Sequence, residues 1–308
     1  MNDAEKHILI IITDAQKRIN QIEECIDEKY WDQIIYLFDV VLPKKVLKFI
    51  TAQYKRKAIL KKYLKKVNFN DKIVLGNYEH IYCRYIRSQF DFNQCIFIDD
   101  GIGSIRAHSD LEKIWVSNLN KPKHFINSLI FLEFKFKAIQ IFTIFELRKS
   151  KYLFPIKHSF EFIKKNFIQS KGSSKDVFFL GQPLTEIKLI SIDDYKNEVL
   201  KIKSYYEEKG LVFNYILHPG ENKLNKEKLF ENIIELKVPV EFHLMNENVL
   251  PKVVASFCST AQFSLDILLG KTILLDIWKT KHFINNYNIT NTLNLLEKTN
   301  QNINFRHL

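Results

Sequence analysis

Short apolar runs alternate with helical patterns along most of the chain, and this alternation starts twice. The first series begins with the apolar run at residues 8–12, which ends at Thr13 and Asp14, a signal for a helix N-cap. A polar stretch at 171–175 interrupts the series, and a second begins with the apolar run at 177–180. Alternating strands and helices are typical of parallel sheets covered by helices. The pattern therefore predicts an α/β protein with two domains.

The length of the chain agrees with this division, because 308 residues suffice for two α/β domains of roughly 150 residues each. We expect an N-terminal domain at 1–170 and a second domain at 171–285. A final segment at 286–308 is expected to pack back on the first domain. Hydrophobic residues make up 46% of the chain, which excludes a disordered class.

Four short polar motifs lie at predicted strand ends, where chemistry gathers in parallel sheets. They are Asp99-Asp100-Gly101, His218-Pro219, Glu241 and Ser259-Thr260. Each has a structural explanation when taken singly. A carboxylate pair before glycine also suits a turn, a histidine also suits a satisfied structural position, and a Ser-Thr pair also suits a helix cap. Their occurrence together favours a site.

The two motifs of the second half have a common chemistry. His218 precedes a proline that restricts it to extended backbone geometry, and an imidazole held in this way can donate to a phosphate. Ser259 and Thr260 precede the helical run at 261–269, whose N-terminus offers hydroxyls and free N–H groups. Both motifs are therefore suited to an anion such as a phosphate.

The order of an acidic pair with glycine, a His-Pro pair and a Ser-Thr pair resembles the bacterial sialyltransferases. Within them it is most similar to glycosyltransferase family 52, the lipooligosaccharide and capsule sialyltransferases. The resemblance covers most of the chain, from the run at 8–12 through Gly181-Gln182-Pro183 to the helix after Thr260. It implies a GT-B fold, in which two Rossmann-like β/α/β domains face a central cleft.

The same resemblance implies an inverting transfer of sialic acid from CMP-sialic acid to a galactose-terminated surface glycan. Asp99 or Asp100 is the expected general base that deprotonates the acceptor hydroxyl. His218 is expected to protonate or bind the departing phosphate. No metal or other cofactor is expected, because CMP leaves readily when hydrogen bonds stabilise its phosphate.

The remaining expected contacts with the donor also come from the resemblance. Glu241 is expected on the ribose hydroxyls, Ser259 and Thr260 on the phosphate, and backbone near Gly181 and Pro219 on the cytosine. The choice of base stays open at this point, because three other carboxylates follow the Gly181 loop: Glu186, Asp193 and Asp194.

The chain carries a formal net charge of +11, which favours contact with polyanions. Seven basic residues fall in the helical stretch 54–67, and Ala58, Ile59 and Leu60 are available for its opposite face. A solvated surface is the commonest explanation of such a stretch. Peripheral contact with an anionic inner membrane is the second explanation, because each Lys or Arg near an anionic leaflet gains about 1 kcal/mol. No nucleic-acid-binding motif is present, so we expect no nucleic-acid partner.

Location and assembly are only weakly indicated. The four cysteines show no spacing typical of zinc sites or disulfide frameworks, which favours a cytoplasmic protein. The run at 8–12 is too short for a signal segment. The stretch 128–145 contains charged residues and is predicted to form an amphipathic helix rather than a membrane span. The aromatic-rich region 131–154 leaves a homodimer open.

Two other functions compete with sialyl transfer. A related glycosyltransferase with another nucleotide-sugar donor would share the fold and most motifs. A basic peripheral-membrane or nucleic-acid-binding protein would have no reason to place an acid, a histidine and hydroxyls at successive strand ends. Stabilisation by CMP but not by UMP or UDP separates the three functions.

Overall fold

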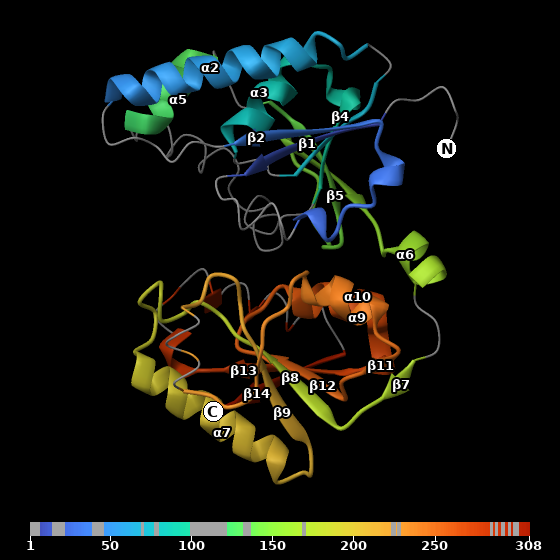
Figure 1. Cartoon of the computed structure of the whole chain (residues 1–308), viewed down its shortest axis with the longest axis vertical. Helices are drawn as coiled ribbons and strands as arrows, with labels where there is room; N and C mark the ends of the chain where they lie inside the picture. The colour runs from blue at the N-terminus through green and yellow to red at the C-terminus, as the bar shows by residue number, and fades with distance from the viewer. Residues whose placement is uncertain are drawn as a thin grey trace. The chain divides into compact units, whose positions relative to one another are not determined.

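Every strand pair in the computed structural model is parallel among the residues described. The chain divides into two units, Met1–His158 and Ser159–Leu308 (Figure 1). The structure describes residues 7–13, 22–38, 46–68, 71–76, 80–98, 122–131, 137–167, 171–222, 226, 229–283, 286, 289–290, 293–294, 297 and 302–308. Two units with parallel sheets and helices agree with the α/β class and with the GT-B type expected from the sequence.

The first unit contains two parallel sheets and three helices in the described residues. The larger sheet has the order β3 (Ile73–Leu75), β4 (Cys95–Ile98), β5 (Ile139–Thr143) and β6 (Leu153–Lys157). The smaller sheet pairs β1 (Ile8–Thr13) with β2 (Gln33–Phe38). The helices are α2 (Val46–Leu64), α3 (Ile81–Gln89) and α5 (Pro122–Phe131), and short 3-10 turns lie at Glu28–Tyr30 and Phe92–Gln94.

The buried residues in the core of the first unit recur at the spacing typical of strands and of helices. Cys95 and Phe97 of β4 are fully buried, whereas Ile96 and Ile98, which alternate with them, turn away from the core. Helix α3 contributes Tyr82, Tyr85 and Ile86, whose spacing places them on one helical face. Further core residues come from α2, α5, β5 and β6: Leu60, Ile130, Phe131, Ile139, Ile141 and Leu153.

The second unit is built on a six-stranded parallel sheet. Its order is β10 (Ile233–Ile234), β9 (Val212–Ile216), β8 (Asp176–Leu180), β12 (Val253–Ser256), β13 (Leu274–Lys279) and β14 (Ile303–His307). A separate pair joins β7 (Gly172–Ser173) to β11 (Val249–Leu250). The helices are α6 (Glu161–Phe167), α7 (Ile192–Glu207), α9 (Val240–Asn246) and α10 (Ala261–Leu269), and 3-10 turns lie at Gly270–Thr272 and Lys281–Phe283.

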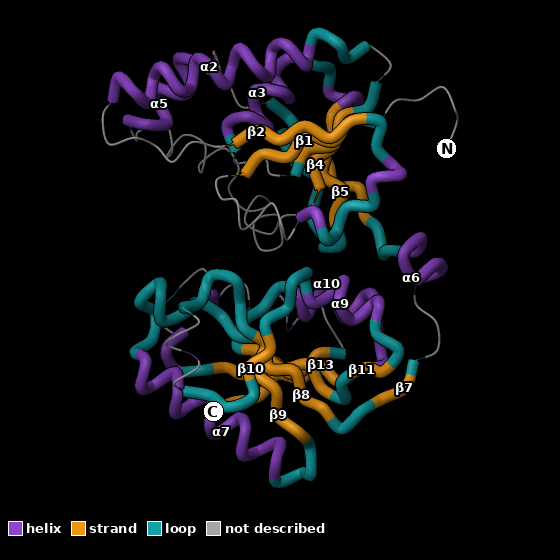
Figure 2. The backbone as a smooth tube through the Cα atoms, in the orientation of Figure 1, coloured by secondary structure: helices purple, strands orange, loops and turns teal. Residues whose placement is uncertain are grey.

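Helices lie on both faces of the six-stranded sheet, with α7 on one face and α9 and α10 on the other (Figure 2). Helix α7 buries Tyr195, Val199, Ile202 and Tyr206, a stripe at three- and four-residue spacing. Because both faces are covered, the central strands are apolar almost throughout, and all four residues of β12 are buried. The restart of the β/α pattern after residue 171 therefore reflects this second sheet.

The C-terminal segment differs from its expected place. We expected 286–308 on the first domain, but residues 303–307 form β14, paired along its length with β13 of the second sheet. The buried carboxylate of Asp276 fixes this strand, accepting bonds from Asn304 at 2.9 Å and Arg306 at 2.7 Å. The first unit ends at His158, before the boundary expected at residue 170.

Two segments form a different type of secondary structure from the one that the sequence predicted. Glu241 was expected at a strand end, but it lies in helix α9, whose N-cap is Pro239. A proline is tolerated at a helix start because the N–H that it lacks would stay unpaired there. The stretch 128–145 was expected to be one helix, but α5 ends at Phe131 and β5 begins at Ile139. Helix α5 leaves Leu129 exposed, and β5 leaves Phe142 exposed. No helix among the described residues is long and apolar enough to cross a membrane.

Candidate functional site

The candidate site lies at the carboxyl edge of three neighbouring strands of the second unit. Strand β8 lies between β9 and β12, and its last residue Leu180 pairs with Ile216 on one side and Ser256 on the other. The segments that follow the three strands therefore leave the sheet at the same level. From β8 the chain proceeds to β9 and β10 on one side, and later returns to β12 on the other. Such a reversal of strand order is where open α/β sheets bind ligands.

Gln182 joins the loop after β8 to the loop after β12. Its amide oxygen accepts a hydrogen bond from the backbone N–H of Cys258 at 2.7 Å, and its amide nitrogen donates to the Cys258 carbonyl at 2.7 Å. The N–H of Gly181 donates to the carbonyl of Ile216 at 2.9 Å, which extends the pairing with β9 by one residue. These bonds hold the loop at the reversal point in one conformation.

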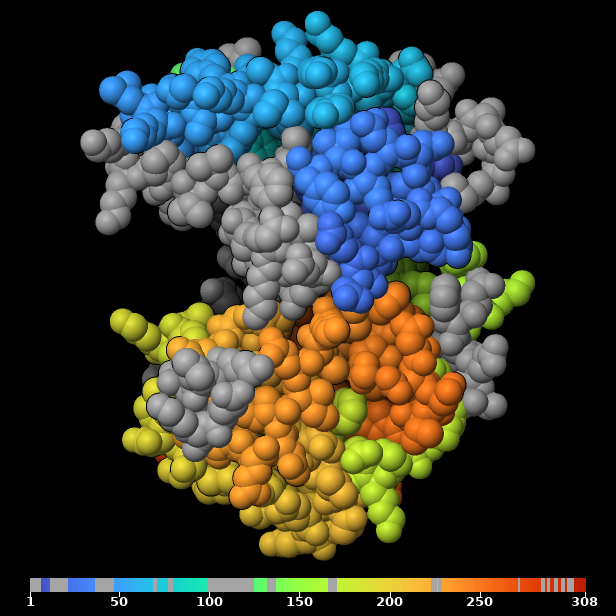
Figure 3. Space-filling model, viewed as in Figure 1, coloured from blue at the N-terminus to red at the C-terminus, as the bar shows by residue number. Residues whose placement is uncertain are grey.

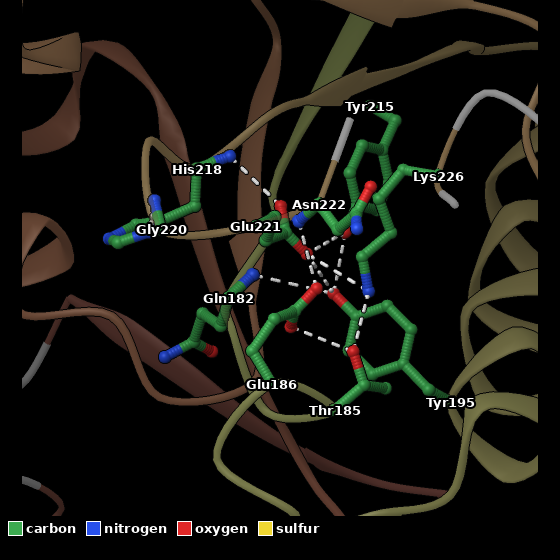
Figure 4. Close-up of polar contacts among 10 residues, drawn as sticks. All are labelled: Gln182, Thr185, Glu186, Tyr195, Tyr215, His218, Gly220, Glu221, Asn222 and Lys226. Atoms are coloured by element: carbon green, nitrogen blue, oxygen red, sulfur yellow. Dashed lines mark hydrogen bonds and ion pairs between the residues drawn. The ribbon is translucent and has the colours of Figure 1, made fainter. Parts of the chain in front are cut away.

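His218 follows β9 and presents one ring nitrogen (Figure 4). The N–H of Gly220 donates to Nδ1 at 2.9 Å, so the neutral imidazole carries its proton on Nε2. Nε2 has no hydrogen-bond partner among the described residues, and the residue lies at the surface. The pKa of the imidazole lies below its ordinary value because neighbouring protein atoms partly desolvate the charged form, and the Glu186 carboxylate offsets this only in part. His218 is therefore an oriented hydrogen-bond donor, and its role toward a phosphate stays a prediction.

A buried carboxylate that the sequence interpretation missed holds the His218 turn. Glu221 is buried, and one of its oxygens accepts the backbone N–H of His218 at 2.9 Å. The other oxygen accepts the Tyr215 hydroxyl at 2.7 Å and lies 3.2 Å from Nζ of Lys226. Burial raises the pKa of Glu221, while these donors and the Lys226 charge oppose that shift. The signal that the sequence offered for this carboxylate was a charged residue directly after Gly220. No pattern in the sequence shows that the side chain of this residue points into the protein.

Lys226 completes this cluster although only 1% of its surface is exposed. Its ammonium lies 4.0 Å from the centroid of the Tyr195 ring, and it donates to the Thr185 hydroxyl at 3.2 Å. The hydroxyls of Tyr195 and Tyr215 are 2.7 Å apart. Because the buried charges of Glu221 and Lys226 are paired and hydrogen-bonded, the cluster avoids the large cost of an isolated buried charge.

Gly181 is required by the close approach of this cluster. A Cβ added at residue 181 would lie 2.6 Å from the Tyr215 hydroxyl and 2.8 Å from its ring, and closer still to the carboxylate of Glu221. Real side chains do not tolerate such distances, so only glycine fits here. The expected contact of this loop with cytosine stays a prediction.

Glu186, one of the carboxylates that could replace the aspartates as general base, is engaged in supporting the same loops. One carboxylate oxygen accepts the N–H of Asn222 at 2.9 Å, and the other accepts the Thr185 hydroxyl at 2.7 Å. Burial alone acts to raise the pKa of Glu186, but these bonds and the Lys226 charge hold it below the ordinary value. A carboxylate with a lowered pKa and two occupied oxygens is a poor proton acceptor, which argues against Glu186 as the base.

Ser259 and Thr260 stand where the sequence predicted, directly before the nine-residue helix α10. Thr260 is the N-cap residue, but its hydroxyl makes no capping hydrogen bond. Neither hydroxyl has a partner among the described residues, and both residues are half-buried. The N–H groups of Gln262 and Phe263 already donate to the carbonyls of Ser259 and Thr260, so the two hydroxyls at the start of α10 are the groups that suit a phosphate.

Glu241 lies in the first turn of α9 rather than at a strand end. Its carboxylate hydrogen-bonds Ser264 of α10, and burial raises the pKa of Glu241 above the ordinary value. Ser264 is four residues after Thr260 and therefore on the same face of α10. The structure thus brings Glu241 to the helix that carries the Ser-Thr pair, although by a different element from the one predicted.

The model of a known family matches most of the chain. The family described as alpha-2,8-polysialyltransferase (POLYST) matches residues 1–274. The chain belongs to the alpha-2,8-polysialyltransferase family. The sequence prediction of a sialyltransferase, and hence of a glycosyltransferase, is therefore confirmed, whereas the finer resemblance to glycosyltransferase family 52 stays a prediction. No curated protein matches this member of the family.

Solved structures similar to this sialyltransferase include two nucleotide-sugar proteins. The complex of Arabidopsis thaliana UGT89C1 with UDP-L-rhamnose shares 10% identity, with a TM-score of 0.49, and the match covers 99% of this chain and 78% of that one. The UDP-GlcNAc 2-epimerase from Methanocaldococcus jannaschii shares 12% identity, with a TM-score of 0.40, covering 88% and 83% of the two chains.

The expected general base of this sialyltransferase, Asp99 or Asp100, lies outside the described residues, directly after the end of β4 at Ile98. Its role stays a prediction. Asp193 and Asp194, the two carboxylates that follow Glu186, lie in the first turn of helix α7, where Asp194 and Ser191 form a reciprocal cap. No described group of three or more His, Cys, Asp and Glu side chains is arranged to hold a metal ion.

Proposed function

We propose that this protein transfers sialic acid from CMP-sialic acid to a surface glycan and binds the CMP phosphate at the carboxyl edge of β9, β8 and β12. One observation carries the proposal. An oriented imidazole N–H follows β9, while two hydroxyls without a described partner and a helix N-terminus follow β12. Strands β9 and β12 are separated by one strand, or about 10 Å, a gap that a phosphate can bridge with side chains from either side.

The proposed reaction is a single inverting displacement. The acceptor hydroxyl oxygen forms a bond to the anomeric carbon of sialic acid as the bond to the CMP phosphate oxygen breaks. CMP departs with the electron pair, and Asp99 or Asp100 takes the acceptor proton. His218 and the hydroxyls of Ser259 and Thr260 stabilise the charge that develops on the phosphate, which is the largest contribution expected from the second unit.

Other features of the proposal rest on the family resemblance rather than on the site. Glu241 binds the ribose hydroxyls, and backbone near Gly181 and Pro219 contacts the cytosine. We also propose that the reaction needs no metal and takes place in the cytoplasm.

The acceptor has two candidates. The sequence resemblance predicts a galactose terminus on a lipooligosaccharide or capsule. The family description favours a sialic acid terminus, extended through an α2,8 linkage. Both acceptors share the donor and the reaction, and they differ in the sugar whose hydroxyl attacks.

Incubation with CMP-sialic acid and each acceptor tests the proposal. We expect CMP release and a glycan larger by one or more sialic acids, in the presence of EDTA. His218→Ala should lower kcat by about 100-fold or more, as removal of one preorganised donor does in other enzymes. His307→Ala, at an exposed position of β14, is the matched control and should retain the wild-type rate. Release of UMP or UDP from another sugar donor, with none of CMP, would reject the proposal.

Single substitutions assign the base. Asp99→Asn or Asp100→Asn should abolish transfer while CMP binding persists, whereas Glu186→Gln should reduce stability more than chemistry. Wild-type rates in both aspartate variants would reject the assignment.

A further inference from the structure

Helix α2 packs through one face on the described residues of the first unit. Phe49, Gln53 and Leu60 are buried along this inner face. Two of its basic residues also point inward: Arg56 donates to the Tyr82 hydroxyl at 2.5 Å, and Lys57 donates to the carbonyl of Ile130 in α5 at 2.6 Å. Burial lowers the pKa of Lys57. These two cations hold the helix in place and are not available to a partner.

The opposite, outer face of α2 and the turn that follows it carry basic residues but no acidic ones. Six exposed lysines lie there: Lys48, Lys55, Lys61, Lys62, Lys65 and Lys66. No acidic residue occurs between residues 46 and 66, and none of the six lysines forms an ion pair within the described part of the chain. An uncompensated row of charges repels itself, so an anionic surface would stabilise it.

Large apolar side chains are exposed between these lysines. Leu47 is 78% exposed and Tyr54 is 57% exposed, and their seven-residue spacing places them on one side of the helix. Ile59, which the sequence made available for the face opposite the basic residues, is 43% exposed. The adjacent helix α5 exposes Phe125 and Leu129, four residues apart. Figure 3 shows α2 at the surface of the first unit.

We propose that the outer face of α2 docks on an anionic lipid bilayer, with the helix axis in the membrane plane. The lysines contact the headgroups, and Leu47 and Tyr54 enter the boundary between headgroups and acyl chains. A cationic polar face combined with exposed apolar residues is typical of helices that bind membranes in this way. A nucleic acid would use the lysines but would leave Leu47 in water. This inference does not depend on the proposed sugar donor.

Sedimentation with vesicles tests this docking on the full chain. Wild-type protein should bind vesicles of phosphatidylglycerol and phosphatidylcholine, and it should bind vesicles of phosphatidylcholine alone much less. The triple variant Lys55→Glu, Lys62→Glu, Lys66→Glu should lose affinity by about 100-fold or more, since each lysine contributes about 1 kcal/mol. The matched control reverses three exposed lysines of the second unit, Lys175→Glu, Lys201→Glu, Lys252→Glu, and should retain most of the binding.

A second variant separates lipid from other polyanions. Leu47→Ser, Tyr54→Ser preserves every charge and should weaken vesicle binding by about 10-fold, because the apolar contribution is lost. Its binding to a single-stranded RNA should equal that of the wild type. The proposal would be overturned if the two triple variants lost the same affinity for vesicles. It would also be overturned if the serine variant bound vesicles as tightly as the wild type. Circular dichroism and thermal unfolding confirm that each variant is folded.

Discussion

The buried carboxylate of Glu221 accepts a hydrogen bond from the backbone N–H of His218 at 2.9 Å (Figure 4). The same turn places the N–H of Gly220 on Nδ1 of the histidine, so both ends of the residue are fixed. The orientation of the proposed phosphate donor therefore depends on a charge buried beneath it. The stability of the turn and the presentation of Nε2 should change together.

Removal of the Glu221 carboxylate should be strongly destabilising. In Glu221→Ala the buried Lys226 ammonium loses its partner, and breaking a buried pair in this way costs about 3–5 kcal/mol in the free energy of unfolding. Urea denaturation measures the change. Glu207→Gln, at an exposed position of α7, is the control and should stay within about 0.5 kcal/mol of the wild type. A loss below about 1 kcal/mol for Glu221→Ala would show that the cluster is not needed for the fold.

An added methyl group at Gly181 should also disturb the cluster. Gly181→Ala forces the Cβ against Tyr215 and Glu221, and overpacking of this kind costs about 1–3 kcal/mol. Gly76→Ala is the matched control, because no described atom beyond its chain neighbours lies within 4 Å of its added Cβ. Thermal unfolding of the two variants checks the prediction. Equal melting temperatures would mean that the loop moves aside freely.

The lowered pKa of His218 predicts a pH dependence of stability. Because the folded state favours the neutral imidazole, its contribution is fully present above the unfolded pKa of about 6.5 and is lost as pH falls through the lower folded pKa. The stability of the wild type minus that of His218→Gln should therefore decrease as pH falls from about 7.5 to about 5. The stability of the wild type minus that of His307→Gln, measured over the same pH range, supplies the baseline. A difference that grows on acidification would contradict the direction of this shift.

Two cysteines should be inert in the folded protein. Burial raises the pKa of Cys258 to about 12 and also raises that of Cys95, so neither is a thiolate at neutral pH. Iodoacetamide at pH of about 8, followed by mass spectrometry, should leave both unmodified until urea is added. Cys25 and Cys83, which are half-buried, should react sooner. Rapid labelling of Cys258 would show that the loop after β12 opens.

Local sequence patterns predicted the second sheet well, because the apolar residues of its strands and helices recur at the regular spacing typical of each element. The run at 261–269 was predicted as a helix and forms α10, and the apolar runs before Gly181 and His218 form β8 and β9. Helix α9 was missed because a short apolar segment suits either a strand or a helix, and the proline before it decided the outcome. Period alone could not settle that choice.

The supporting cluster of the site could not be predicted from the sequence. Glu221 and Lys226 are ordinary surface residues in type, and their burial arises only when the loops after β8 and β9 meet around Tyr195 and Tyr215. The place of Glu241 beside Ser264 likewise depends on the packing of α9 on α10. The order of the motifs in the sequence identified residues that can contact a ligand. The residues that hold those ligand-facing residues in place are determined by tertiary contacts.

Calorimetric titration of CMP tests the central claim most directly. The wild type should bind CMP, and Thr260→Val and Ser259→Ala should each raise Kd by about 10-fold or more, since a hydrogen bond to a charged group contributes about 1.5–3 kcal/mol. The two changes remove hydroxyls that support no other described residue, so the fold should persist. An unchanged Kd in both variants would contradict a phosphate site at the end of β12.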